Sequence, residues 1–391
     1  MDLTIQPRKL NGTVAAIPSK SQAHRYMICA AFSDNPTQLL CPETNLDIEA
    51  TGNCLRTLGA VIDRTETGYH INPIQNIPTQ AVLPCGESGS TLRFMLPIAA
   101  ALGVDATFVM AGRLPQRPLF PLDQELERMG CKITRPTDTT LRCQGKLLPG
   151  AYSIDGSVSS QFITGLLFAH SLMNGESTLT ITGKLESKPY IKLTQNAMAL
   201  FQAPHYHSPG IVTVEGDWSN AAFFLAANQL GNSVTVTNLS ADSDQGDQAA
   251  GTLLPRLSEN ITIDVSDIPD LVPILAVTAA ANKGAAFTHI QRLRLKESDR
   301  VSSTVQLICQ LGGQAQATED CLIVHGTGLI GGITDSFNDH RIAMAAAIAA
   351  TACEKPVTIL NAQATNKSYP SFWEEYRRLG GSICEAPMAN F

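Results

Sequence analysis

The chain has 391 residues, of which 44% are hydrophobic, and a formal net charge of -7 at pH 7. This length suggests two or three domains, and the hydrophobic content is sufficient to give each of them a core. The acidic balance argues against a nucleic-acid-binding protein, which would normally carry a basic excess. The longest apolar runs are shorter than the roughly 18 to 20 residues that a membrane span requires, and the first residues lack the apolar segment of a secretory signal. The composition therefore predicts a soluble, cytosolic globular protein.

The cysteines and histidines give no sign of a metal site. Ten cysteines are scattered along the chain without a C-x-x-C pair or histidines at ligand spacing, so we expect buried free thiols rather than a disulfide framework. His205 and His207 flank a tyrosine, but no acidic or cysteine partner stands nearby at ligand spacing. We interpret this segment as a loop or a strand end.

The first predicted strand, residues 12–17, leads into a predicted helix over residues 21–32. The junction, Ile17 to Arg25, holds a lysine, an arginine, a histidine and two serines. In an acidic chain, such a local cluster of cations indicates a site for an anion.

A repeated pattern then runs along the chain, in which the tail of a helix leads into a strand, a polar turn and a second strand. Clear copies occupy residues 54–73, 125–145 and 307–326, weaker copies occupy 198–216 and 253–267, and a truncated copy begins at Glu375. The spacing is too long for a solenoid, so each copy indicates an α/β unit with two helices and several strands. Six such units predict an α/β protein of two similar domains, each with three units.

Apolar helices are predicted between these repeats, and polar clusters stand at their starts. Their ranges are 88–103, 159–173, 269–284, 296–312 and 338–352. Such apolar helices should be buried, and the Ser, Asp and Asn residues at their starts are typical N-caps.

N-capping does not explain the cations in the first turns of these helices, which are Lys20, Arg25, Arg93, Lys296, Arg300 and Arg341. A cation facing the positive end of a helix dipole costs about 0.3 to 1 kcal/mol unless an anion lies between them. Repetition of this arrangement predicts that several helix starts converge on an anionic ligand.

Other motifs do not support a different chemistry. Residues 326–332 match G-x-G-x-x-G, but no helix follows, so we interpret the segment as turns. The chain lacks a Walker A sequence and a G-x-S-x-G elbow. His24 and His340 adjoin the cationic positions, and we assign neither a chemical role.

Short motifs spread over the whole chain resemble those of the EPSP synthase (3-phosphoshikimate 1-carboxyvinyltransferase) family. In chain order they are PSKSQAHR, SGSTLR, RLPQRPL, SVSSQF, ESKPY, IPD, LKESDR, NDHRIAM and ATNKSYP. The resemblance implies a cytosolic enzyme of the shikimate pathway, in aromatic amino acid biosynthesis. Such an enzyme transfers the enolpyruvyl group of phosphoenolpyruvate to the 5-hydroxyl of shikimate 3-phosphate and releases phosphate.

The resemblance also implies two domains of three α/β units each, with the active site in the cleft between them. The domain boundaries are then expected after Ile17 and after Val214, so that residues 1–17 join 215–391 and residues 18–214 form the central domain. No cofactor and no metal are implied, and we expect a monomer.

The two substrates carry phosphate and carboxylate groups, which explains why cations are needed on several elements. By resemblance, the ligands of shikimate 3-phosphate are Lys20, Ser21, Arg25, Ser159, Ser160, Gln161, Ser187, Asp270 and Lys296. By the same resemblance, the ligands of phosphoenolpyruvate are Lys20, Gly89, Arg117, Gln161, Arg300, Arg341 and Lys367. Asp270 resembles the base and Glu297 the proton donor, and Lys20 shares the acid role.

Several positions depart from the family's usual pattern. The family commonly has a glycine between the residues equivalent to Pro18 and Ser19, and an asparagine where Glu87 stands. Arg292 occupies a position where some members have a ligand asparagine, so we assign it no role. The third and fourth repeats are short for the family. By analogy with members that have a glycine at the position of Gly89, the chain is expected to be sensitive to glyphosate.

Two alternatives remain open at this point. The related UDP-N-acetylglucosamine 1-carboxyvinyltransferases typically have Lys-Asn where this chain has Lys20 and Ser21, and a loop cysteine near the equivalent of Arg117, which this chain lacks. The other alternative is a non-catalytic anion-binding relative, against which the presence of Lys20, Asp270 and Glu297 argues.

Overall fold

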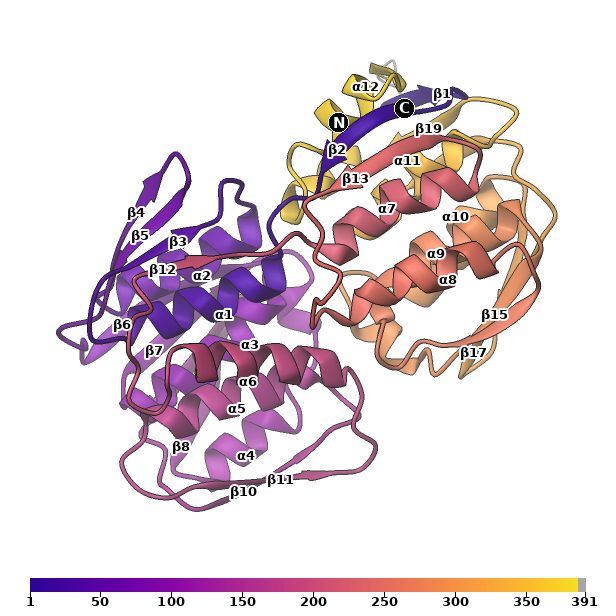
Figure 1. Cartoon of the computed structure of the whole chain (residues 1–391). Coiled ribbons are helices and arrows are strands. Elements are labelled where there is room, and N and C mark those ends of the chain that lie inside the picture. Colours follow the sequence, from indigo (N-terminus) through magenta and orange to yellow (C-terminus); the bar gives the residue numbers. More distant parts are fainter. Residues whose placement is uncertain (386–391) are drawn as a thin grey trace. The chain divides into compact units, whose positions relative to one another are not determined.

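The structure is a computed structural model that describes residues 1–385, and it divides into two compact units (Figure 1). The central unit comprises Pro18–Glu215, and the end unit comprises Met1–Ile17 together with the chain from Gly216 onward. Glu215 belongs to the central unit, one residue beyond the expected boundary. Its carbonyl accepts a hydrogen bond from Ser19 N at 2.8 Å and its amide donates to Gln22 Oε1 at 2.7 Å.

Each unit contains two four-stranded sheets of one common topology. In the central unit, one sheet has the strand order β12 (Ile211–Thr213), β3 (Thr37–Leu40), β5 (Gly68–Asn72), β4 (Val61–Thr65). The other sheet has the order β6 (Gln80–Gly86), β7 (Asp105–Met110), β9 (Thr140–Gly145), β8 (Cys131–Thr137). In the end unit they are β14 (Ile261–Asp264), β15 (Gly284–Thr288), β17 (Cys321–His325), β16 (Gln314–Ala317), and β18 (Gly332–Asp335), β19 (Val357–Leu360), β1 (Leu3–Gln6), β20 (Ser382–Glu385). In every case the first two strands are parallel and the others are antiparallel. This shared pattern is a structural counterpart of the sequence repeat.

Each unit also has one two-stranded sheet that contains only the parallel pair. These pairs are β10 (Ala151–Asp155) with β11 (Thr178–Thr182), and β2 (Asn11–Ala15) with β13 (Ser233–Thr237).

The expectation of two strands in every repeat was wrong for the third and fourth copies. In residues 198–216 only β12 forms, and in residues 253–267 only β14 forms. In the third copy, Pro204 and Pro209 lack the amide that a strand ladder needs.

Most of the buried helical residues belong to six helices. They are α1 (Lys20–Ala31), α3 (Gly89–Leu102) and α5 (Ser160–Leu172) in the central unit, and α7 (Trp218–Gln229), α9 (Val272–Ala281) and α11 (His340–Ala350) in the end unit. The remaining helices are α2 (Leu46–Thr57), α4 (Leu122–Arg128), α6 (Lys188–Leu200), α8 (Ala250–Arg256), α10 (Arg300–Gln310) and α12 (Phe372–Arg378).

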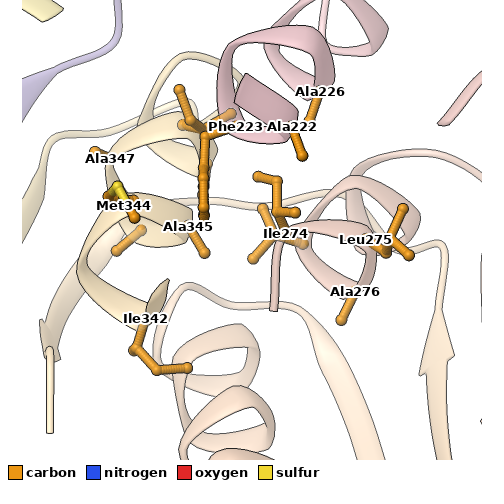
Figure 2. Close-up of a cluster of buried hydrophobic side chains, with 14 of the residues drawn as sticks. Ala222, Phe223, Ala226, Ile274, Leu275, Ala276, Ile342, Met344, Ala345 and Ala347 are labelled. Atoms are coloured by element: carbon orange, nitrogen blue, oxygen red, sulfur yellow. The ribbon is translucent and has the colours of Figure 1, made fainter. Parts of the chain in front are cut away.

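The core of the end unit forms where α7, α9 and α11 meet. Figure 2 shows Ala222 and Phe223 of α7, Ile274 of α9 and Ala345 of α11 in one cluster, and all four are fully buried. Alanines on facing helices let the backbones approach closely while Ile and Phe fill the space between them. This packing fixes the starts of the three helices relative to one another.

In the central unit, α3 and α5 pack even more closely. A Cβ placed on Gly165 of α5 would lie 2.2 Å from the carbonyl oxygen of Arg93 on α3. Only glycine permits this approach, which sets the start of α5 beside that of α3.

Two expectations about elements need correction. The helix predicted over 296–312 begins at Arg300, so Lys296 lies before it in the segment that follows the 3-10 turn η4 (Gln291–Leu295). That helix, α10, is amphipathic rather than wholly buried, because Gln306 and Gln310 are exposed while Leu307 and Ile308 are buried.

The cysteines are all free thiols, and seven of the ten are buried as expected. Cys309 on α10 and Cys384 on β20 are exposed, and Cys321 on β17 is half-buried. Residues 205–207 form a loop, as the sequence predicted, and Nδ1 of His207 lies 2.7 Å from Oδ2 of Asp34.

Candidate active site

The polar residues at the helix starts act as N-caps. The capping side chains, each accepting a hydrogen bond from a backbone amide of the first turn, are Ser19, Ser88, Ser159, Asp299 and Asp339. These side chains accept hydrogen bonds from backbone amides that would otherwise lack partners. They do not account for the cations beside them, whose partners are described below.

At the start of α1, Lys20 and Arg25 have different environments. Nζ of Lys20 lies 2.8 Å from Oδ2 of Asp47 at the start of α2, and both side chains are 15% exposed. Arg25 is 2% exposed, and its guanidinium donates to the carbonyl of Ser21 and to Oγ1 of Thr194. Lys20 is therefore the accessible cation of this pair.

Arg25 connects α1 to α6. It donates to the carbonyl oxygen of Tyr190 at 2.9 Å and lies 5.2 Å from the ring centroid of Phe94. Burial lowers the pKa of Arg25 to about 10, so the side chain remains a cation at neutral pH. Ser187, which precedes α6, is 1% exposed and has a left-handed backbone with φ of 54°.

The starts of α3 and α5 are joined by side-chain hydrogen bonds. Arg93 donates to Oε1 of Gln161 at 2.8 Å, and Nε2 of Gln161 donates to Oγ of Ser90 at 2.9 Å. Ser159 and Ser160 lie directly before Gln161, at the cap and first residue of α5. The structure thus joins Gln161, which the family resemblance assigned to both substrates, to Arg93 and Ser90 of α3, to which it assigned no ligand role.

Gly89 lies beneath two guanidinium groups. A Cβ on this residue would be 2.6 Å from Nη1 of Arg117 and 2.7 Å from Nη1 of Arg93. A side chain at this position would displace the ends of both cationic side chains. Arg117 is 7% exposed and lies at the end of the short turn η1 (Leu114–Gln116).

The end unit contains a second cluster, in which three cations surround the carboxylate of Asp270. Its Oδ1 is 2.7 Å from Nη1 of Arg300 and 3.4 Å from Nζ of Lys296, and its Oδ2 is 3.4 Å from Nη2 of Arg341. Asp270 lies in the turn η3 (Pro269–Leu271) that leads into α9. Three cations close to one carboxylate favour its ionised form.

Arg300 is the most buried member of this cluster, with a side chain 1% exposed. Its Nε donates to Oδ2 of Asp339 at 2.9 Å and its Nη2 donates to Oε2 of Glu297 at 2.5 Å. Burial acts to lower the pKa of Arg300, but the neighbouring carboxylates outweigh it and raise that pKa. Burial also lowers the pKa of Lys296 to about 8, against the attraction of Asp270.

Arg341 and Lys367 are held by backbone carbonyls near the start of α11. Nη1 of Arg341 donates to the carbonyl oxygen of Ser219 at 3.3 Å, and Nζ of Lys367 donates to that of Asn338 at 2.7 Å. The structure therefore places all predicted site residues of the end unit around Asp270 and the first turn of α11. In the central unit, the predicted residues lie at the starts of α1, α3, α5 and α6 and at Arg117.

Sequence reasoning missed the acidic partners of these cations. Asp47 contacts Lys20, and Asp339 contacts Arg300, across 27 and 39 residues of sequence. Both stand at or near a helix start, where an acidic residue is also an ordinary cap or dipole partner. The sequence therefore did not reveal that these two carboxylates also contact Lys20 and Arg300. Arg93 was recognised as a cation but was given no ligand role.

Within residues 1–385, no group of His, Cys, Asp and Glu is arranged to hold a metal ion. None of the helices in that range combines the length and apolar character that crossing a membrane requires.

Comparison with known proteins identifies relatives along nearly the whole chain. The profile of the family described as EPSP synthase (3-phosphoshikimate 1-carboxyvinyltransferase) matches residues 5–376. The chain is 37% identical to the 3-phosphoshikimate 1-carboxyvinyltransferase of Clostridium kluyveri, with 98% of each chain covered. It is 36% identical to that of Clostridium novyi, with 99% of each chain covered.

The fold agrees with these sequence matches. A solved structure of EPSP synthase from Acinetobacter baumannii superposes with a TM-score of 0.77 at 21% identity, covering 98% of this chain and 99% of the other. At 21% identity, this similarity is evidence for the fold alone. The family match over residues 5–376 and the relatives above 30% identity show that this chain belongs to the EPSP synthase family of transferases.

Proposed function

We propose that this chain transfers the enolpyruvyl group of phosphoenolpyruvate to the 5-hydroxyl of shikimate 3-phosphate, releasing phosphate. The observation that carries the proposal is the cluster around Asp270, where one carboxylate lies within 3.4 Å of Arg300, Lys296 and Arg341. Such a cluster suits the binding of phosphate and carboxylate groups next to a proton-accepting residue. The family match and the relatives favour this activity over that of the related UDP-N-acetylglucosamine enzymes.

In this proposal, the ligands of the two substrates are those that the family resemblance implies. Shikimate 3-phosphate binds to the hydroxyls, amide and cations of Lys20, Ser21, Arg25, Ser159, Ser160, Gln161, Ser187, Asp270 and Lys296. Phosphoenolpyruvate binds to Lys20, Gly89, Arg117, Gln161, Arg300, Arg341 and Lys367. The helix amides at the start of α5 favour a phosphate, because they add to the positive end of the helix dipole.

Asp270 acts as the base for the attacking 5-hydroxyl. The cations around it keep its carboxylate ionised, which a base requires before it can accept a proton. Glu297 donates a proton to the methylene carbon of phosphoenolpyruvate. The positively charged guanidinium of Arg300 contacts the carboxyl group of Glu297. An anionic substrate on Arg300 would offset that positive charge and make protonation of Glu297 easier.

The second half of the reaction removes phosphate from the tetrahedral intermediate. Proton transfer then runs in the opposite sense, so the carboxyl groups exchange their roles. Lys20, which is accessible and paired with Asp47, shares the acid role. The carboxyl and amino groups named here supply every proton transfer that the reaction needs, and we propose that no cofactor takes part.

We further propose that the enzyme acts as a cytosolic monomer. Both sets of proposed ligands come from one chain, so no second copy is needed to supply a missing residue.

A coupled phosphate-release assay tests the proposal. Phosphate should appear only when phosphoenolpyruvate and shikimate 3-phosphate are both present, and the Asp270→Asn enzyme should release little. Phosphate release with UDP-N-acetylglucosamine instead of shikimate 3-phosphate would favour the alternative transferase. Binding of both anions without release by the wild type would indicate a non-catalytic relative.

A further inference from the structure

A short segment before α8 holds the first turn of α7. Oε1 of Gln245 accepts a hydrogen bond from the amide of Trp218 at 3.1 Å, and its Nε2 donates to the carbonyl of Gly216 at 2.8 Å. Two residues later, Oδ2 of Asp247 accepts a hydrogen bond from the hydroxyl of Ser219. The segment therefore fixes the backbone of α7 where that helix begins.

Ser219 connects this segment to the proposed phosphoenolpyruvate ligand Arg341. Its carbonyl oxygen accepts a hydrogen bond from Nη1 of Arg341 at 3.3 Å, while Nη2 of the same guanidinium lies 3.4 Å from Asp270. A continuous series of contacts thus runs from Asp247 through Ser219 and Arg341 to Asp270. All four residues lie in the end unit.

Asp247 is an unusual buried carboxyl group. It is 2% exposed, and its Oδ1 has no hydrogen-bond partner among the residues that the structure describes. A carboxylate in such a place loses most of its hydration, and a single hydroxyl donor does not replace it.

The charged groups that act on Asp247 come from three elements. Asp217 caps α7, Asp270 lies in η3, and Arg341 lies on α11; α8, which follows the segment, carries only the exposed Arg256. Burial and, to a lesser extent, the negative charge of Asp270 raise the pKa of Asp247 to about 7, against the opposing charge of Arg341. The carboxyl group is thus poised to change its charge near neutral pH.

We propose that Asp247 is a positioning residue for Arg341, and that ionisation of Asp247 weakens the hold of Arg341 on the anionic donor substrate. The hydrogen bond to Ser219 fixes the carbonyl that orients the guanidinium. A negative charge on Asp247 competes with the substrate for the positive charge of Arg341, and the buried environment strengthens that competition. The inference rests on the proposed function, because it takes phosphoenolpyruvate as the ligand of Arg341.

The experiment compares the pH dependence of KM for phosphoenolpyruvate, from pH 5.5 to 9, in the wild type and three variants. Asp247→Asn keeps the shape of the side chain and an acceptor for Ser219 but cannot ionise. Ser219→Ala keeps the carbonyl that binds Arg341 and removes the hydroxyl. Asp242→Asn changes an exposed aspartate of the same loop and serves as the matched control.

For the wild type and Asp242→Asn, we expect KM for phosphoenolpyruvate to rise several-fold as the pH passes through 7. The Asp247→Asn enzyme should lack this rise. Titration of the substrate phosphate affects all the enzymes equally and cancels in the ratio of their KM values. In Ser219→Ala, loss of a hydrogen bond to the carboxylate should move the rise to higher pH, since that bond lowers the pKa of Asp247. Coinciding profiles for the wild type and Asp247→Asn would overturn the inference.

Thermal unfolding supplies a readout that needs no substrate. The pKa of Asp247 is raised on folding, so its protonated form stabilises the native state at low pH, and this stability is lost as the pH rises to about 7. Asp247→Asn should therefore gain in melting temperature relative to the wild type between pH 5 and pH 8. A constant difference would contradict the assigned titration. Absence of any turnover in the wild type would instead overturn the proposed function and the link to its substrate.

Discussion

The carboxylate of Asp270 and the guanidinium of Arg300 form a 2.7 Å ion pair, although one residue is proposed as the base and the other as a ligand of phosphoenolpyruvate. Arg300 also contacts Glu297, the proposed proton donor. One buried cation therefore touches both carboxyl groups that are proposed to exchange protons with the substrates. In the proposed mechanism this geometry couples the charge of the bound substrate to the protonation of both groups, and it leads to the first two predictions.

Asp270→Asn should reduce both turnover and the binding of shikimate 3-phosphate. The change removes the proposed base, and it also leaves Lys296, Arg300 and Arg341 without the negative charge that separates them. We expect kcat to fall by about 10² or more, the scale usual for general acid–base catalysis. Steady-state kinetics and titration calorimetry with shikimate 3-phosphate would measure the two effects, and unchanged affinity would argue against Asp270 as a ligand.

Glu297→Gln should separate chemistry from binding. Glutamine retains the size of the side chain but cannot supply the proton, so kcat should fall by about 10² or more while affinity for shikimate 3-phosphate changes little. Glu319→Gln, at an exposed turn of the same unit, is the matched control and should behave as the wild type. Equal and modest losses in Glu297→Gln and Asp270→Asn would show that the roles are assigned wrongly.

Gly89→Ala should weaken inhibition by glyphosate more than it weakens binding of phosphoenolpyruvate. We expect glyphosate to compete with phosphoenolpyruvate in the wild type, because its phosphonate and carboxylate can occupy the same cationic positions. The added methyl group would lie 2.6 Å from Nη1 of Arg117, so the guanidinium must move. A misfit of this size typically costs about 1 to 3 kcal/mol.

The inhibition constants for the wild type and Gly89→Ala would test this prediction. Gly251→Ala on α8 is a suitable control, because the nearest atom to its added methyl group, on Trp218, is 3.8 Å away. Undiminished inhibition of Gly89→Ala, or inhibition that does not compete with phosphoenolpyruvate, would place the inhibitor elsewhere.

Gly165→Ala should destabilise the central unit and disturb Arg93. The new methyl group would meet the carbonyl oxygen of Arg93 at 2.2 Å, so α3 and α5 must separate. Overpacking of this kind costs typically about 1 to 3 kcal/mol. Urea unfolding would measure the loss, with Gly251→Ala again as the control, which we expect to be neutral or slightly stabilising. A wild-type midpoint for Gly165→Ala would show that the two helices adapt more easily than their packing indicates.

The sequence alone determined the local features of this protein. Ser88, Ser159 and Asp339 cap helices as their positions predicted, because capping depends on residues only two or three apart. Burial of the apolar runs after them could also be predicted, because their composition is a local property of the sequence. The family motifs are likewise short segments. The order of these motifs was sufficient to indicate the family, since it requires no knowledge of which segments meet in space.

The tertiary structure decided which residues pair. Leu3 lies opposite both Ile359 and Glu385, so the first strand completes a sheet whose other strands come from the end of the chain. Asp339 caps α11 and also holds Arg300, and hydrogen bonds connect Asp247 to Arg341 through Ser219. No local pattern encodes such contacts, because they arise from the packing of helices that are distant in sequence, and a carboxylate placed as a cap looks the same whether or not a buried arginine reaches it.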